Sequence, residues 1–386
     1  MAHGVNSLDS VMVDPMGPDF ASSLGLDLHE LSHIRGSYSL AAACAAAIIA
    51  LGIDKFHRRN SFLFFLAGLC VSMFVAAFSQ SKTEFLVARF MAGLCSGPLV
   101  ALSFAAITDY SPIKKRASAI AAIMSISGLV TLLGVPCVLE ISRLFGWHTT
   151  FLINATVGLA ILVIAYYQFP KEPLILLKPA VIEPTVHRSF KLFWRKEILI
   201  AYALVAVTVI GSGLVAPHLS GFLQFDLGME RHELWHLYLF GGSLSLLALQ
   251  CGGWLVDKYT FLKVATGCVI LGGILMSSGY VLAPPVLPIS LVFAGTTMVT
   301  SLRTMTVLTL SSRIPNASER GSYMALQTMV QHLAMALGTL ISGLILEIGF
   351  FDEMTGMEII FGCAILISLF IPYFIWRLET KYPPSI

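Results

Sequence analysis

Four ionisable side chains stand inside otherwise apolar stretches of this sequence: Asp9, Asp14, Arg89 and Arg303. If these stretches cross a membrane, each charge costs roughly 2.5–3.5 kcal/mol at the bilayer centre on insertion scales, so each needs a reason. A buried carboxylate can take up and release a proton, and a nearby fixed cation tunes that exchange. Asp9, Asp14 and Arg89 are therefore the candidate proton-coupling residues.

Each of these residues also has a plainer interpretation. Asp9 and Asp14 would lie about 140° apart on one helix, so at most one of them faces a central cavity squarely. Asp9 could instead be solvated at a cytoplasmic helix end, and Arg89 could extend to the outer membrane surface. Arg303 lies deep in its segment, and we expect it to face a cavity or an acidic partner.

A second group of polar residues lies in one late apolar segment: Gln327, Gln331 and His332. The two glutamines are four positions apart and share a helix face. They could offer hydrogen bonds to a solute or simply join neighbouring helices, and the histidine could be a packing residue. With Arg303, these three form the candidate substrate cavity.

The composition is that of a membrane protein. Of the 386 residues, 56% are hydrophobic and 12% are charged, whereas soluble domains carry roughly 25% charged residues. The sequence lacks a basic block for nucleic acid and a signal peptide. It also lacks a CxxC pair, a nucleotide-binding motif and a nucleophile–base set, so we expect no metal, no cofactor and no enzyme activity.

Eleven stretches reach the roughly 20 apolar residues that a membrane-spanning helix needs. They centre on residues 36–53, 61–80, 84–108, 117–142, 149–169, 198–222, 234–256, 262–283, 286–310, 319–347 and 357–377. Residues 1–26 are a weaker twelfth candidate. The sequence thus predicts an all-α membrane protein of 12 transmembrane helices, with a short first one.

Lysines and arginines predict the orientation, since they favour the cytoplasmic side. Most fall on one side if the N-terminus is cytoplasmic, which places both termini inside. The predicted outer connections hold only Arg35, Lys82, Arg143 and Arg231. The most basic connection is residues 170–197, so we predict a six-helix bundle over 1–169, a cytoplasmic linker over 170–197 and a second bundle over 198–386.

The two predicted bundles resemble each other in sequence. Pro15 corresponds to Pro217, and the pair Asp54-Lys55 corresponds to Asp257-Lys258 at nearly the same separation. Such parallel repeats suit an alternating-access carrier whose site lies between its pseudo-symmetric halves. The repeat requires residues 1–26 to cross the membrane, and implies either a short first helix or a natural start upstream of Met1.

The recurring Asp-Lys pairs resemble a signature of the major facilitator superfamily, G-x-L-a-D-r-x-G-r-k. The segment "ALGIDKFHRR" matches it at Asp54, Lys55, Arg58 and Arg59, and "GGWLVDK" matches it at Asp257 and Lys258. In that family this element is understood as a cytoplasmic gate. The resemblance implies that these six residues form such a gate here.

Three further motifs resemble the drug:proton antiporter and sugar-efflux-type branch of that superfamily. "RFMAGLCSG" places Arg89, Gly93 and Gly97, and "LDSVMVDPMGP" places Asp9. "GLVTLLGVP" places the helix-packing residues Gly128, Gly134 and Pro136. The resemblance implies a proton role for Asp9 and Arg89, and close helix packing at the glycines.

These observations predict a monomeric, proton-coupled secondary transporter of the inner (plasma) membrane. Its partners would be protons, a small organic solute and the lipid bilayer, and export is the expected direction. Two alternatives stay open at this point: a proton-driven importer with the same fold, and a membrane sensor that transports nothing.

Overall fold

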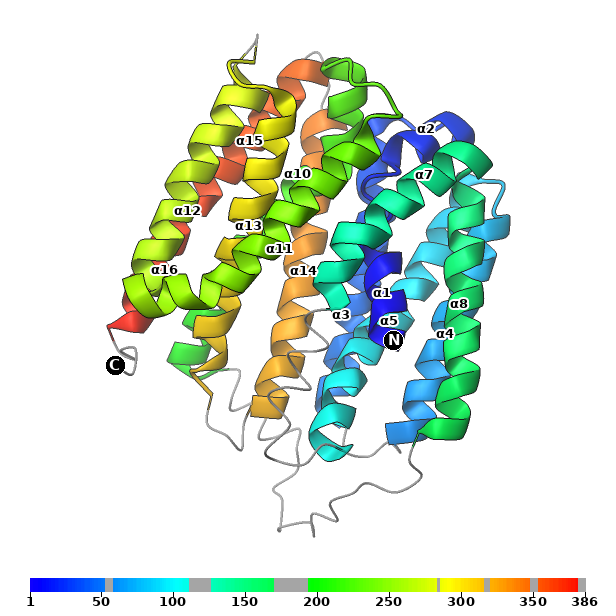
Figure 1. The fold of residues 1–386 in the computed structure, drawn as a ribbon. Coiled ribbons are helices and arrows are strands. Elements are labelled where there is room, and N and C mark those ends of the chain that lie inside the picture. Colours follow the sequence, from blue (N-terminus) through cyan, green and yellow to red (C-terminus); the bar gives the residue numbers. More distant parts are fainter. Residues whose placement is uncertain are drawn as a thin grey trace, which may run out of the picture.

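The structure is a computed structural model that describes residues 1–52, 58–110, 126–169, 194–282, 285–315, 320–347 and 353–380. Every regular element in these ranges is a helix. Figure 1 shows α1–α8 gathered on one side of the molecule and α10–α16 on the other, with the long helices running between its two ends. The predicted all-helical class is confirmed.

The first segment is not the continuous short helix that the repeat predicts. It forms two helices, α1 (Ala2–Val11) and α2 (Gly17–Leu24), joined by a turn. Pro15 in this turn has no backbone N–H and disfavours helical geometry at Asp14 before it. Pro18 stands in the first turn of α2, where proline is favoured. The two candidate aspartates therefore lie on different elements, and the angle expected for a single helix does not apply.

The helices that follow on this side begin with α3, which starts earlier than the predicted residue 36. Its observed start at Leu31 brings Arg35 into the helix, and the assignment of this arginine to an outer connection is wrong. After η1 (Leu28–Glu30), this side contains α3 (Leu31–Gly52), α4 (Arg58–Phe78), α5 (Lys82–Tyr110), helical residues 126–129, the π-helical η4 (Val130–Gly134), α7 (Val135–Phe145) and α8 (Trp147–Gln168).

The other side has a similar sequence of long helices with two more π-helical segments. It contains α10 (Lys196–Gly221), η5 (Phe222–Asp226), α11 (Leu234–Tyr259), α12 (Phe261–Met276), η6 (Ser277–Val281), α13 (Ile289–Ser312), α14 (Arg320–Glu347), α15 (Glu353–Ser368) and α16 (Phe370–Glu379). Within the described residues, 10 helical stretches are long and apolar enough to cross a membrane. The broken first segment and α3 are not among them.

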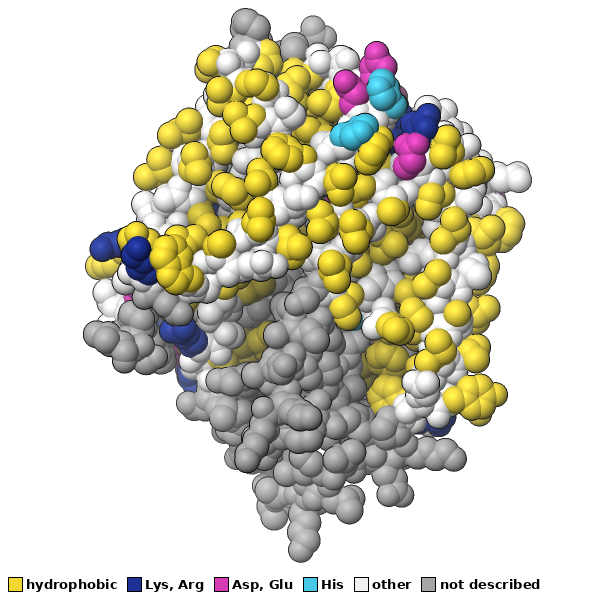
Figure 2. Space-filling view, in the orientation of Figure 1, with side chains coloured by type: hydrophobic (Ala, Val, Ile, Leu, Met, Phe, Trp, Pro, Cys, Tyr) yellow, Lys and Arg dark blue, Asp and Glu magenta, His cyan; other side chains and the backbone are white. Residues whose placement is uncertain are grey.

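The surface of the molecule fits a lipid environment. Figure 2 shows hydrophobic side chains over most of the described part of the visible face. Acidic and histidine side chains gather with a basic one at its upper right, and further basic side chains lie at its left edge. Large apolar residues such as Phe64, Ile270 and Leu366 are exposed on different helices. A soluble domain does not leave such an extensive apolar surface in water, so the chain is a multi-pass membrane protein.

Helix α3 lies between α5 on its own side and α14 on the other side. Glycines allow both approaches: Gly93 and Gly97 of α5 meet the backbone of α3, and Gly343 of α14 meets Ser32. Small residues at such contacts let helix backbones approach closely in a membrane. Any displacement of α3 is therefore transmitted to the boundary between the two sides.

Candidate functional site

Asp9 of α1 and Arg89 of α5 form a buried ion pair. Arg89 Nη1 donates to Asp9 Oδ1 at 2.7 Å, and Nη2 donates to the Asp9 carbonyl oxygen at 3.2 Å. The side chains are 0% and 1% exposed, respectively. In the described part of the chain, Asp9 Oδ2 and Arg89 Nε have no hydrogen-bond partner. One carboxylate oxygen of Asp9 therefore lacks a hydrogen-bond partner among the described residues.

Aromatic residues surround the Arg89 guanidinium. Its central carbon lies 4.6 Å from the ring centroid of Tyr38 and 5.7 Å from that of Phe151. The Tyr38 hydroxyl donates to Ser96 Oγ at 2.6 Å, which fixes the ring against α5. Rings facing a cation stabilise it electrostatically, most strongly where water is excluded. These contacts hold the arginine in place and contradict the interpretation that it extends to the membrane surface.

Asp14 pairs with a different arginine, and more loosely. Arg35 Nε lies 3.7 Å from Asp14 Oδ1, and the two side chains are 10% and 14% exposed, respectively. Arg35 also donates to the carbonyl oxygen of Ser10. The Asp14 carbonyl accepts a hydrogen bond at 2.9 Å from Ser220 Oγ of α10. This second pair therefore lies where the two sides of the molecule meet.

The predicted cavity residues do not converge on one point. Gln327 is buried and accepts a hydrogen bond at 2.7 Å from Ser311 Oγ, which joins α14 to α13. Gln331 and His332 are partly exposed on α14. Arg303 Nη1 donates to Ser368 Oγ at 2.9 Å, on the α15 side of its helix. The structure thus gives Gln327 a contact with α13 and Arg303 a contact with α15.

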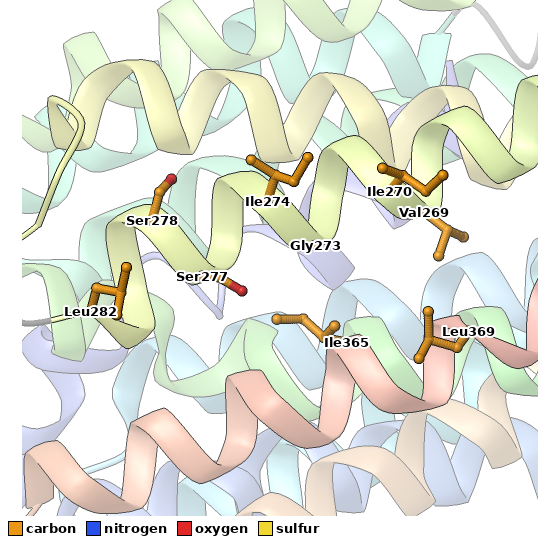
Figure 3. A pocket seen from close by; sticks show the side chains of 9 residues that line it. All are labelled: Val269, Ile270, Gly273, Ile274, Ser277, Ser278, Leu282, Ile365 and Leu369. Carbon is orange, nitrogen blue, oxygen red and sulfur yellow. The ribbon is translucent and has the colours of Figure 1, made fainter.

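An apolar groove of about 460 Å³ lies between α12 and α15, and Arg303 is not among the residues that line it. Figure 3 shows Val269, Ile270 and Ile274 of α12 and Ile365 of α15 lining it. Ser368, the partner of Arg303, is the chain neighbour of the lining residue Leu369. The groove is formed within one side of the molecule, so it is not the cavity expected between the two sides.

Arg303 has no carboxylate partner among the residues that the structure describes. Its Nε also lacks a hydrogen bond there, although the residue is only 8% exposed. We expect Arg303→Met to raise the unfolding free energy by about 1–3 kcal/mol, because it keeps most of the volume and removes a poorly compensated buried charge. Thermal unfolding in detergent measures this. If Arg303→Met instead lowers the midpoint of thermal unfolding, a negatively charged group must stabilise Arg303 in the folded protein.

The predicted cytoplasmic gate is described only in part. Asp54 and Lys55 lie outside the described residues, as do the side chains of Arg58 and Asp257. Arg59 donates to the carbonyl oxygen of Tyr166 on α8 at 2.5 Å. Lys258 lies 4.7 Å from the ring centroid of Trp254 on its own helix. Each of these two contacts lies within one side of the molecule, so neither of them joins the two sides.

The glycines of the fifth predicted span lie at close contacts. A Cβ at Gly128 would sit 3.3 Å from Leu246 of α11, and one at Gly134 would sit 3.0 Å from Leu8 of α1. Pro136 stands in the first turn of α7, directly after the π-helical η4. Proline removes a backbone donor, and wider π-turns accommodate such interruptions.

An ion pair that sequence reasoning missed joins the two sides at the end where α2 lies. Arg231 donates from Nε to Asp19 Oδ1 at 2.9 Å and from Nη2 to Asp19 Oδ2 at 2.7 Å. Ser142 Oγ of α7 donates to Asp19 Oδ2 at 2.5 Å. From sequence alone, charged residues near helix ends are expected to be exposed to water. Only the arrangement of the two repeats in space could have suggested that Asp19 and Arg231 pair.

Comparison with known families decides what kind of membrane protein carries these pairs. The family model described as "Major Facilitator Superfamily" matches residues 1–339, which is most of the chain. The chain belongs to the major facilitator superfamily. This superfamily consists of membrane transporters and not of enzymes, in agreement with the absence of a catalytic set in the sequence analysis.

Named relatives of this superfamily member are distant. The inner membrane transport protein YdhP of Escherichia coli K12 is 22% identical over 215 residues, covering 55% of this chain and 53% of the relative. Multidrug resistance protein 3 of Bacillus subtilis is 22% identical over 304 residues, covering 72% of this chain and 56% of the relative. The chain thus matches little more than half the length of these relatives.

Solved structures agree with the superfamily fold over nearly the whole chain. A D-xylose-proton symporter superposes with a TM-score of 0.77 and 19% identity, covering 98% of this chain and 95% of the symporter. A bacterial homologue of the lysosomal transporter Spinster, in an inward-facing and occupied conformation, gives a TM-score of 0.75 at 14% identity, with the same coverage. At such low identity these likenesses establish the fold alone.

Proposed function

We propose that this superfamily member is a proton-coupled secondary transporter that exports a small organic solute by alternating access. It would act as a monomer in the inner (plasma) membrane, with both termini in the cytoplasm. The observation that carries the proposal is the buried Asp9–Arg89 pair, with its unpartnered carboxylate oxygen. A dry ion pair has no evident structural need, because apolar residues pack at least as stably there.

The helices of the described residues are compatible with twelve crossings in two units, which supports this proposal. α1 and α2 together would make the first crossing, α3 the second, and the 10 long apolar stretches the others. The units would be residues 1–169 and 198–386, with the basic connection 170–197 on the cytoplasmic side. In such carriers the solute site lies between the two units, near the middle of the membrane.

Protonation would act through the Asp9–Arg89 contact. When a proton binds Asp9 Oδ2, the carboxylate loses its charge and its attraction for the guanidinium falls. The Arg89 guanidinium is then a buried cation that faces aromatic rings and a carbonyl oxygen. Breaking a buried pair in this way costs about 3–5 kcal/mol, which is enough to favour a different arrangement of the helices.

Asp14 is the second proton-binding candidate because it lies between the sides. Its pair with Arg35 is looser, and its own carbonyl oxygen accepts a hydrogen bond from Ser220 of the other side. A change in charge at Asp14 would therefore alter the contacts at the boundary between the two sides. Gln331 and His332 of α14 remain our candidates for solute contact, since α14 packs against α3 at this boundary.

Reconstitution into proteoliposomes tests the proposal. We expect an imposed pH gradient to drive flux of a candidate organic solute, and an uncoupler to collapse that flux. The direction of solute movement relative to the proton separates an exporter from an importer with the same site. A membrane sensor that transports nothing predicts two other results. No solute in a broad panel would move, and cells carrying a neutral variant of Arg89 would behave like cells carrying the parent protein.

A further inference from the structure

A cluster at one end of the molecule holds the two sides together by charge. The outer cluster, defined as Asp19 of α2, Ser142 of α7 and Arg231, is a two-point ion pair with a hydroxyl bonded to the same carboxylate. Arg231 Nη2 also donates to the carbonyl oxygen of Leu139 at 3.2 Å. One guanidinium before α11 therefore binds two helices of the opposite side.

The Asp19 end of this contact is firmly anchored. Its neighbour Phe20 is 0% exposed, with its ring centroid 4.9 Å from Phe85 and 5.1 Å from Trp147. The Trp147 indole also donates to Ser23 Oγ of α2 at 2.6 Å. Because α2 is fixed in this aromatic group, pulling Arg231 away must break the ion pair and cannot simply drag Asp19 along.

Other contacts between the two sides accompany the outer cluster. Ser220 of α10 donates to the carbonyl oxygen of Asp14, and the backbone of Leu132 in η4 lies close to Gly242 of α11. Of the ion pairs recorded in the described residues, Asp19–Arg231 is the one that crosses between α1–α8 and α10–α16. The distribution of lysine and arginine places Arg231 on the outer face.

We propose that the outer cluster keeps the outer face closed in the arrangement seen here, and that it breaks each time the carrier opens outward. Asp19 and Arg231 are 19% and 22% exposed, so water can solvate both charges once they part. The fully buried Asp9–Arg89 pair lacks that access. The outer cluster therefore suits repeated opening, with a bidentate geometry that recovers the closed state specifically.

This inference rests on the alternating access of the proposed function, but on neither proton coupling nor the direction of transport. A labelling experiment that needs no substrate can test it. Ser220 is 0% exposed and lies at the boundary, so Ser220→Cys reports opening of the outer face. The seven native cysteines are free. Six of these cysteines are replaced. The buried Cys70 is kept, because it becomes accessible to the label only if the protein unfolds.

Intact cells are treated with a membrane-impermeant maleimide. We expect Asp19→Asn and Arg231→Gln each to raise the labelling rate at position 220 on the order of tenfold, since each breaks a charge-assisted bidentate contact. The double exchange Asp19→Arg with Arg231→Asp should bring the rate back toward that of the parent. Labelling at Cys70 should stay low in all variants, which excludes unfolding as the cause.

Glu140→Gln is the matched control. Glu140 lies on α7 beside Ser142, but its partner Arg143 is on the same helix, with Nε 2.9 Å from Glu140 Oε2. This variant removes a carboxylate whose hydrogen bonds stay within α7 and which feels Arg231 only through space. We therefore expect its labelling rate to stay close to that of the parent and well below that of Asp19→Asn. Equal rates in Asp19→Asn, Arg231→Gln and Glu140→Gln would overturn the inference, whether or not a pH gradient drives flux.

Discussion

Asp9→Asn should reduce pH-driven solute flux to the level of protein-free liposomes. Asparagine keeps the size of the side chain and an oxygen for Arg89, but it cannot bind and release a proton. The variant is fixed close to the protonated state, so a proton gradient no longer has a group to act on. Flux measured with and without an imposed pH gradient, at equal protein content, gives the result.

Removing one member of the same ion pair should cost stability, even though replacing the whole pair need not. Arg89→Met would leave the Asp9 carboxylate buried with no cation, and we expect it to lower the unfolding free energy by about 3–5 kcal/mol. The double variant Asp9→Asn with Arg89→Met should cost less than the sum of the two single changes, because no buried charge remains. Thermal unfolding in detergent of all four proteins gives this coupling directly.

Asp14→Asn is the comparison variant for both measurements, because Asp14 is the second proton-binding candidate. Asp14 belongs to the same broken segment, but its arginine lies 3.7 Å away and its side chain is 14% exposed. Its stability loss should therefore be well below that of Arg89→Met, since a partly hydrated charge is less costly to leave unpaired. If Asp9→Asn retains full gradient-driven flux while Asp14→Asn loses it, the coupling role belongs to Asp14.

Sequence reasoning named both members of this pair, together with Asp14, as candidate proton-coupling residues, but it did not predict which aspartate Arg89 would contact. Asp9 and Arg89 are conspicuous as charges in apolar stretches, and the motif resemblance assigned both to proton coupling. What it did not predict is their arrangement. A continuous first helix would have placed Asp9 and Asp14 on one element, whereas the break at Pro15 gives each aspartate its own arginine.

Arg35 was missed for a physical reason that applies to many helix boundaries. Serine, histidine and arginine near residue 35 lower the local hydropathy, so an apolar window begins after them. The helix itself begins at Leu31, and Arg35 within it contacts the Ser10 carbonyl oxygen and Asp14. Asp19 and Arg231 were missed similarly, since pairing across 212 positions leaves no local pattern.

The predicted packing glycines allow a second prediction with a large effect. An ideal Cβ built on Gly93 would overlap the backbone carbonyl of Tyr38, and one on Gly97 would overlap that of Ala42. A backbone atom cannot rotate away as a side chain does, so α3 must shift as a whole. We expect Gly93→Ala to lower the unfolding free energy by about 1–3 kcal/mol or more, as overpacking does.

Gly267→Ala provides the matched control, because Gly267 is an exposed residue in the interior of α12 with no atom within 4 Å of an added Cβ. There alanine should raise the unfolding free energy by about 0.5–1 kcal/mol, since it is the better helix former. Thermal unfolding of the two variants side by side measures the difference. Equal midpoints would mean that α3 and α5 are not in close contact at Gly93.

The effect of Gly93→Ala on flux should exceed what its stability alone explains. Tyr38, whose backbone would be displaced, also holds its ring against the Arg89 guanidinium and its hydroxyl against Ser96. α3 in turn packs against α14, so its shift changes the boundary between the sides. Flux per folded protein should therefore fall in Gly93→Ala and stay at the parent level in Gly267→Ala. An equal fall in flux per folded protein in both variants would contradict the inference that the position of α3 affects transport.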